Sequence, residues 1–365
     1  MQTRKLKSKE PFVHVEKRNE LGPRESLLLR LGSVLLALIA GGIFMIAIGH
    51  NPFELYGTII SGAFRSEMAF QATIKIMIPL LISSLAVTLA FKMRFWNIGG
   101  EGQIIMGAIC SSYFALFCSD LPHPLLMLIM FIAGAVGGGL WGLIPAFFKV
   151  KFDTNETLLT LMLNYIALNI IVLLRDGPWA DPTSQGFPKI SRFVDNAQLD
   201  KLFGIQIGWL IGLVLVVAVL VYLRYTKHGY EISVVGESKS TATYAGINVK
   251  KVVLRTMFIS GAIAGVAGMV QSSGSDYTLA TAVAGGVGFT AIIVVWLAHL
   301  NTVGILVISF LFSILEKGSS VMQSTYGIST YSANVIQGII LFFVLACEFF
   351  IFYKFSFRRK GRRKV

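Results

Sequence analysis

The chain has 365 residues, a formal net charge of +13, 55% hydrophobic residues, 14% charged residues and a mean hydropathy of +0.70. Soluble domains carry about 25% charged residues, so this composition leaves no room for a large soluble domain. The positive charge does not indicate nucleic acid binding, because the lysines and arginines cluster beside apolar stretches, where the cytoplasmic face of a bilayer favours them.

Ten apolar stretches approach the length of about 20 residues that a helix needs to cross a bilayer. We therefore expect an all-α, polytopic membrane protein of about ten transmembrane helices, with broken or re-entrant segments. A transmembrane domain, 31–353, lies between basic tails at 1–30 and 354–365. The predicted spans are residues 31–49, 72–91, 98–118, 125–148, 157–174, 207–224, 253–271, 284–299, 303–321 and 333–353.

The distribution of basic residues predicts the orientation. Of the 32 lysines and arginines, 25 lie in the two tails and in the turns and loop on the same side of the membrane. The positive-inside tendency therefore places both termini in the cytoplasm of a cell-membrane protein. Five spans precede the largest outside loop, 175–206, and five follow it, so the second half runs in the opposite sense to the first. This is the topology of an inverted repeat.

An amphipathic segment lies before the second predicted span, and a polar segment rich in glycine lies at the start of the third. Residues 53–64 are amphipathic and predict a short interfacial helix. Three glycines then interrupt the run from Asn97 to Gln103 and permit close approach or an unwound backbone. Asn97, Glu101 and Gln103 place polar groups just inside the membrane, where a charge is costly, so they are candidate pathway residues. The alternative is that Glu101 pairs with Lys92 or Arg94 and only orients the turn.

A third polar group opens the fifth span. Glu156, Thr160 and Asn164 recur at intervals of four residues and share one helix face, and Asn155 precedes them. Such a stripe faces protein or water rather than lipid. It predicts either contact with a transported solute or hydrogen bonding between helices.

Two loops differ in composition. The outside loop, 176–206, is rich in glycine and proline, which predicts fixed turns. The cytoplasmic loop, 225–252, contains a short helix that Ser238 can cap and Gly246 can end. The pair Lys239-Ser240 follows Ser238 rather than glycine and no strand precedes it, so it is not a nucleotide-binding loop.

A second glycine-rich break, Gly285-Gly286-Val287-Gly288, opens the short eighth span. Such a break points to a transport pathway, with Phe289 and Thr290 as candidates, or to packing of helices through small residues. The sequence shows no catalytic triad, paired carboxylates or metal-binding cluster. Cys110, Cys118 and Cys347 lack metal spacing, so we expect no metal or cofactor, and the lack of a catalytic cluster disfavours a membrane enzyme.

These segments, in this order, resemble the branched simple-sugar and nucleoside class of ABC importer permeases, most closely its nucleoside subgroup. The resemblance covers roughly residues 70–345. The resemblance rests on four segments, which are Asn97–Gln103, Asn155–Tyr165, Tyr244–Asn248 and Gly288–Thr290. The spacing of Ala242 and Gly246 is similar to the core of the permease loop that docks on an ATPase, although Thr241-Ala242 stands where a Glu-Ala-Ala signature would be fuller.

The resemblance implies ATP-driven uptake of nucleosides. The implied partners are a second, different permease subunit, a cytoplasmic ABC ATPase and an outside substrate-binding lipoprotein. The alternatives are a sugar permease of the same class, and an ion-coupled transporter that uses Glu101 or Glu348. We expect the pathway to be lined by Asn97, Glu101, Gln103, Asn155, Glu156, Asn164, Phe289 and Thr290, and the ATPase to contact Glu237, Ser238, Ala242, Tyr244, Ala245 and Gly246.

Overall fold

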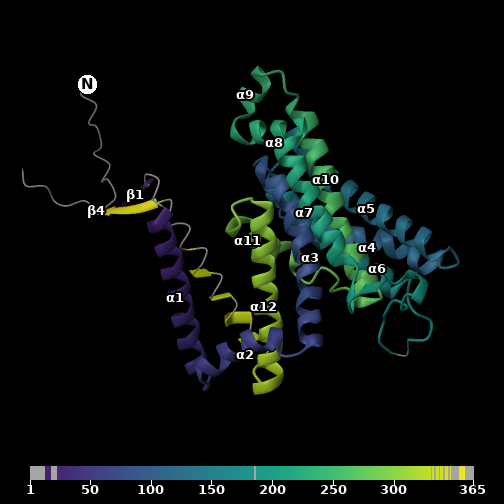
Figure 1. Ribbon diagram of the computed structural model, residues 1–365. Coiled ribbons are helices and arrows are strands. Elements are labelled where there is room, and N and C mark those ends of the chain that lie inside the picture. The colour runs from purple at the N-terminus through teal and green to yellow at the C-terminus, as the bar shows by residue number, and fades with distance from the viewer. Residues whose placement is uncertain are drawn as a thin grey trace, which may run out of the picture. The chain divides into compact units, whose positions relative to one another are not determined.

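The computed structural model describes residues 13–17, 23–184, 186–329, 331–332, 334–336, 338–339, 342–343, 346 and 353–357 (Figure 1). These residues fall into two compact units, one within Ser61–Lys317 and one within Met1–Ile60 and Gly318–Val365. The main helices are α1 (Pro23–Ala47), α2 (Pro52–Phe64), α3 (Glu67–Lys92), α4 (Gly100–Phe117), α5 (His123–Phe152), α6 (Glu156–Asp176), α7 (Gly208–Tyr225), α8 (Lys227–Glu237), α9 (Lys239–Tyr244), α10 (Val249–Gln271), α11 (Val287–Leu297) and α12 (Thr302–Tyr326).

Helices long and apolar enough to cross a membrane dominate the described part of the chain. There are six, and seven if a pair bent by 113° between α1 and α2 counts as one span. The six are α3, α5, α6, α7, α12 and the segment Val249–Asp276, which contains α10 and a π-helical turn, η2 (Ser272–Asp276). The prediction of an all-α, polytopic membrane protein is thus confirmed. The tenth predicted span, 333–353, lies partly outside the described residues.

Several helix bounds differ from the predicted spans for local reasons. The first helix begins at Pro23, inside the predicted N-terminal tail. In the eighth predicted span the helix covers only Val287–Leu297. Gly285 and Gly286 have left-handed backbones before it, and His299 and Leu300 have them after it, so the helix ends at both sides.

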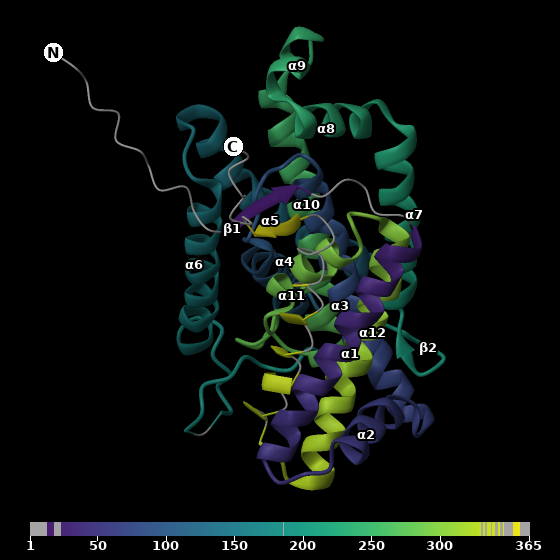
Figure 2. The ribbon, with the colours of Figure 1, turned by 90° about the vertical axis from the view of Figure 1, so that its left-hand side faces the viewer.

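The unit within Ser61–Lys317 is built around α3, α4, α5 and α10, which lie side by side in Figures 1 and 2. Over its most apolar window α3 is 83% buried, whereas the corresponding figure for α5, α6 and α7 is 28%. Glycines bring the backbones of α4, α5 and α10 together. A Cβ on Gly107 would meet Gly265, and a Cβ on Gly138 would meet Gly261, so larger residues would push these helices apart.

Two irregular regions occupy opposite ends of this unit (Figures 1 and 2). One end carries α8 and α9. The other carries residues 177–207, with a bridge between Ala180 and Ile190, a 3-10 turn at Asp195–Ala197, and the antiparallel pair β2 (Lys201–Leu202) and β3 (Ile205–Gln206). The two regions are therefore separated by the length of the membrane-type helices of this unit.

The other unit contains α1, most of α2 and the last turns of α12. The predicted interfacial segment is helical, as α2, and the Tyr56 hydroxyl donates to the carbonyl of Leu38 at 2.7 Å. The ring of His50 meets that of Tyr326 edge-on. Two strands complete the unit, β1 (Val13–Lys17) and β4 (Tyr353–Phe357), and they pair antiparallel with Val13 opposite Phe357.

Candidate functional site

The Asn97–Gln103 segment forms a compact turn at the start of α4. The Asn97 side-chain oxygen accepts from the Gly99 N–H at 3.0 Å, and the Asn97 amide pairs with the Gln103 amide at 3.3 and 3.4 Å. Both side chains are buried. Because their polar atoms are used inside the turn, Asn97 and Gln103 fix the direction in which α4 enters the membrane domain.

The polar stripe of α6 packs directly against this turn. The Asn164 oxygen accepts from the Gly102 N–H at 2.8 Å, and its NH₂ donates to the Ile98 carbonyl at 2.9 Å. The Thr160 hydroxyl accepts from the Ile98 N–H at 3.3 Å. A helix start has N–H groups without intrahelical partners, and α6 supplies them here. Of the two alternatives for the stripe, Thr160 and Asn164 take hydrogen bonding between helices in this structure.

Glu101 joins the two glycine breaks. Its carboxylate oxygens accept from the N–H groups of Gly286 and Gly288 at 2.7 and 2.8 Å. Neighbouring Lys92 and Arg94 were the alternative partners, and the structure instead places the carboxylate on the first turn of α11. A negative charge at a helix N-terminus is worth about 0.3–1 kcal/mol, and up to about 2 when partly buried.

Only glycine permits this approach at position 288. A Cβ there would overlap the backbone of Glu101. Gly286 has a φ of 83°, in the left-handed region, and directs the chain into α11. The glycines of the second break therefore serve both the turn and the contact with α4.

The remaining predicted pathway residues are more open. The Phe289 side chain is 42% exposed, and the Thr290 hydroxyl donates to the Gly286 carbonyl at 3.3 Å. Asn155 is exposed and caps α6 by accepting from the Leu158 N–H at 3.2 Å. Glu156 forms an ion pair with Lys149 at 3.0 Å. The structure thus brings Asn97, Glu101, Gln103 and Asn164 into one cluster and leaves Asn155 and Glu156 at the helix boundary.

A second contact network lies at the far end of α10 and was not predicted. The Leu199 N–H donates to the Ser273 carbonyl at 3.0 Å, and the Phe193 N–H donates to the Tyr277 carbonyl at 2.8 Å. The Gln206 amide donates to the Ser275 hydroxyl at 3.0 Å. The 177–207 loop therefore holds the π-helical turn η2 at the point where the chain leaves α10.

A polar cavity of about 480 Å³ lies beside this network. Its residues come from the end of α6, the 177–207 loop, the last residue of η2 and the chain after it. The Arg192 guanidinium lies 5.3 Å from the centre of the Tyr277 ring, a cation–π contact. At the rim, the pKa of Asp181 is lowered because its carboxylate accepts from the Thr183 hydroxyl and N–H, with Lys189 nearby.

At the opposite end, α9 covers Lys239–Tyr244, whereas Glu237 is the last residue of α8. The Ser238 hydroxyl accepts from the Thr241 N–H at 3.2 Å, and Gly246 has a φ of 77° just past the helix. Ala242 is buried, whereas Tyr244 is 96% exposed. The prediction of a short helix capped by Ser238 and ended by Gly246 is confirmed, and the helix presents a bare aromatic ring.

The α8–α9 segment is tied to the membrane helices in two ways. The Arg255 guanidinium of α10 donates to the Glu231 carboxylate of α8 at 2.9 Å and lowers its pKa. A Cβ on Gly236 would meet the Lys92 carbonyl, so α8 lies directly against the end of α3. Lys92 precedes the Asn97–Gln103 turn by a few residues, so α8 packs close to the segment that leads into the cluster.

Comparison with known proteins places these features in context. The family described as "Branched-chain amino acid transport system / permease component" matches residues 68–345. The glucose ABC transporter permease protein TsgB13 of Haloferax volcanii is 31% identical, over 90% of each chain. The guanosine ABC transporter permease protein NupP of Bacillus subtilis is 29% identical, over 92% of this chain and 97% of its own length. The nucleoside ABC transporter permease protein NupB of Lactococcus lactis is 31% identical, over 89% and 92%.

Proposed function

Because the chain belongs to the permease-component family of branched-chain amino acid transport systems, a family of transport subunits rather than enzymes, we propose that it carries nucleosides across the cell membrane in an ATP-driven importer. The observation that carries the substrate class is similarity along nearly the whole chain to a guanosine permease and a nucleoside permease. The similar glucose permease makes a sugar the second candidate.

We propose ten crossings with both termini in the cytoplasm, arranged as two inverted halves. The pairing of β1 with β4 supports an even number, because strands that precede the first span and follow the last can pair only on one side of the membrane. The eleven residues of α11 span about 16 Å, roughly half of a bilayer core. The eighth crossing would therefore combine α11 with the non-helical chain after η2, as in the broken spans of other transporters.

The proposed domain limits follow from this topology. They are the basic tails 1–30 and 354–365, the membrane domain 31–353, the outside loop 175–206 and the cytoplasmic coupling loop 225–252. The arrangement of residues 177–207 and of α8 and α9 at opposite ends of one unit supports these assignments.

The proposed pathway runs along the cluster where α4, α6 and α11 meet. Within it, the Phe289 ring is the group best suited to stack on a nucleobase, because its side chain is exposed. Asn97, Gln103 and Asn164 would position the helices, since their polar atoms are engaged with protein. Glu101 would hold the broken span onto α4. In this proposal Glu101 has a structural role instead of the ion-coupling role of the alternative hypothesis. Glu348, the other carboxylate in that hypothesis, lies outside the described residues.

The polar cavity near Tyr277 is the proposed outer entrance. It offers charged groups for hydroxyls and an aromatic ring, the combination that suits a nucleoside. The same loop, 176–206, is the proposed contact for the substrate-binding lipoprotein, because its turns are held by the network at η2.

The proposed contact for the ABC ATPase is the α9 segment. Tyr244 is exposed there, and the buried Ala242 seats α9 on its own unit. The other proposed contact residues are Glu237, Ser238, Ala245 and Gly246. A second, different permease subunit would complete the pathway.

Reconstitution tests the proposed substrate. The chain is placed in proteoliposomes with its cognate ATPase, second permease and binding protein, and ATP-dependent uptake of radiolabelled guanosine and glucose is measured. We expect guanosine uptake, competed by other nucleosides and not by glucose. Glucose uptake without guanosine uptake would assign the sugar class, and uptake without ATP would contradict the importer.

Cysteine labelling tests the pathway separately. In a background lacking Cys110, Cys118 and Cys347, a cysteine at Phe289 should react with a small polar thiol reagent, and substrate should slow the reaction. A cysteine at Ile132, which is exposed near the middle of α5, is the control for a lipid-facing position. Labelling at 289 only by a lipid-soluble reagent would place the pathway elsewhere.

A further inference from the structure

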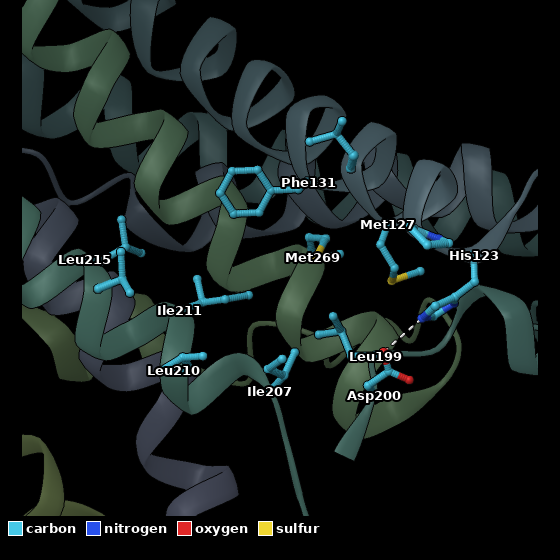
Figure 3. Close-up of a pocket in the computed structure, with 13 residues that line it drawn as sticks. His123, Met127, Phe131, Leu199, Asp200, Ile207, Leu210, Ile211, Leu215 and Met269 are labelled. Carbon is cyan, nitrogen blue, oxygen red and sulfur yellow. Dashed lines mark hydrogen bonds and ion pairs between the residues drawn. The ribbon is translucent and has the colours of Figure 1, made fainter. Parts of the chain in front are cut away.

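A groove between α5, α7 and α10 has no part in the proposed pathway. Its volume is about 550 Å³, and Figure 3 shows apolar side chains of α5 and α7 on either side of it. Met127 and Phe131 come from α5, and Ile211 and Leu215 come from α7. Both helices are long and apolar enough to cross a membrane.

The floor of the groove is formed by the end of α10, just before the π-helical turn η2. Met269, near the end of α10, forms the floor (Figure 3). Its carbonyl accepts from the hydroxyls of Ser272 and Ser273, at 3.2 and 2.6 Å. These serines begin η2, from which the chain leads to Gly286 and the Glu101 carboxylate. The groove therefore lies next to the turn from which the proposed eighth crossing starts.

The rim of the groove carries two polar side chains, His123 and Asp200. His123 contacts the Asp200 carboxylate at 3.1 Å through Nε2 and the Asn196 carbonyl at 2.8 Å through Nδ1. The Asp200 side chain is 75% exposed. Among the residues that the structure describes, no lysine or arginine lines the groove, and the neighbouring Lys201 ammonium lies 5.7 Å from the Tyr277 ring centre. Because both ring nitrogens of His123 face oxygen acceptors, the ring donates twice and is cationic. The rim therefore pairs a cationic ring with an exposed carboxylate, which suits a zwitterionic headgroup with an amine and a phosphate better than a purely anionic one.

We propose that this groove binds one acyl chain of an amine-bearing phospholipid, of the phosphatidylethanolamine type, with its headgroup beside Asp200. The wall residues Leu128 and Val214 are exposed on the outer surface of the two helices, so the groove opens toward the hydrocarbon of the bilayer. Water would find few hydrogen-bond partners in a cavity with this lining. An acyl chain restores the dispersion contacts that an empty groove would lack.

The test uses the complete transport complex in nanodiscs that contain a phosphatidylethanolamine with a photoreactive diazirine in its acyl chain. Labelled peptides are mapped by mass spectrometry. We expect labelling on the peptides that carry Met127–Phe131 and Leu210–Leu215. Ile211→Trp fills the groove and should lower this labelling about tenfold, as loss of about 1.4 kcal/mol of binding would. Leu213→Trp, on the exposed surface of α7 outside the groove, is the matched control and should leave it unchanged.

Two further arms separate the lipid from other occupants. Size-exclusion chromatography reports whether Ile211→Trp destabilises the chain. If it does, Leu128→Trp is used instead: it fills the groove from α5 and should lower the labelling to the same extent. Asp200→Asn should remove the preference for phosphatidylethanolamine over phosphatidylglycerol as competitor. Equal labelling around the whole membrane surface, or labelling unchanged by both tryptophan variants, would overturn the proposal. A cysteine at Val214 that crosslinks to the second permease would overturn it too, by giving the groove to a partner helix.

Discussion

The α4 entrance and the α9 segment are both short polar regions next to membrane helices, yet they use their polar groups differently. At the α4 entrance, Asn97, Gln103 and Asn164 are buried and bonded to protein. In α9, the caps are local and Tyr244 is bare. The comparison teaches that a polar cluster at membrane depth can be structural, whereas an exposed helix at the membrane surface is free to contact a partner. Substitutions should therefore lower stability in the first region and coupling in the second.

The largest loss of stability is expected for Asn164→Ala. The change leaves the Gly102 N–H and the Ile98 carbonyl without their partner, and each buried unsatisfied group costs about 1–3 kcal/mol. We expect the free energy of unfolding in detergent to fall by about 2–4 kcal/mol. Asn169→Ala, on the same helix, is the control, because Asn169 is exposed and its NH₂ donates to the Tyr165 carbonyl, one turn earlier on the same helix. Equal effects of the two changes would break the comparison.

Gly288→Ala should have the next largest effect. The new methyl group overlaps the backbone of Glu101, so α11 must move away from α4 at a cost of about 1–3 kcal/mol. Uptake should fall with stability, because the two glycine breaks separate. Ala282→Ser, at an exposed position in the same segment, should change neither quantity. Normal uptake by Gly288→Ala would show that the Glu101 contact is dispensable.

The Glu231–Arg255 ion pair between α8 and α10 should make the stability of the chain depend on pH. The folded pKa of Glu231 lies below its ordinary value of 4.5, mainly because Arg255 donates to it. Since the pKa is lowered on folding, the pair's stabilisation is fully present above the unfolded pKa and is lost as pH falls through the folded pKa. Glu231→Gln should therefore flatten the decline in stability below about pH 4.5. At neutral pH it should cost about 1 kcal/mol or less, as for ion pairs near a surface. An unchanged pH profile would show that the pair contributes nothing.

The smallest effect on stability is expected for Tyr244→Ala, which should stay within about 0.5 kcal/mol because the ring touches little of its own chain. Substrate-stimulated ATP hydrolysis by the assembled complex should nevertheless be strongly reduced, since bare aromatic residues often dominate interfaces. Tyr230→Ala, at an exposed tyrosine of α8, is the control. Full stimulation in the Tyr244 variant would remove α9 from the ATPase contact.

What the sequence could predict here is local. Ser238, Gly246 and the amphipathic run 53–64 carry their signals within a few residues, and the corresponding helices are present. The partner of Glu101 could not be predicted in the same way, because Gly286 lies 185 residues away and only the packing of α4 against α11 brings them together. The polar stripe on α6 predicted a protein-facing surface, but its spacing could not choose between a solute and the α4 backbone.

The close packing of α4, α5 and α10 was also beyond prediction. Their glycines are scattered in separate apolar stretches, and each glycine alone also fits a bend or a break. Only the structure shows that the backbones of Gly107 and Gly265 meet. The lipid groove has no sequence signal either, because its apolar residues look like any other membrane-facing surface.

The pairing of β1 with β4 sets an order on the biogenesis of the chain. Lys17 is opposite Tyr353, so β1 emerges from the ribosome roughly 340 residues before its partner. At about 5–20 residues per second, that strand waits tens of seconds with an unpaired edge. An unpaired edge is a template for association with other chains, so the final strand protects the first. A chain cut short before Tyr353 leaves β1 without its strand partner, and its defect would appear as aggregation at the first strand rather than at the cut.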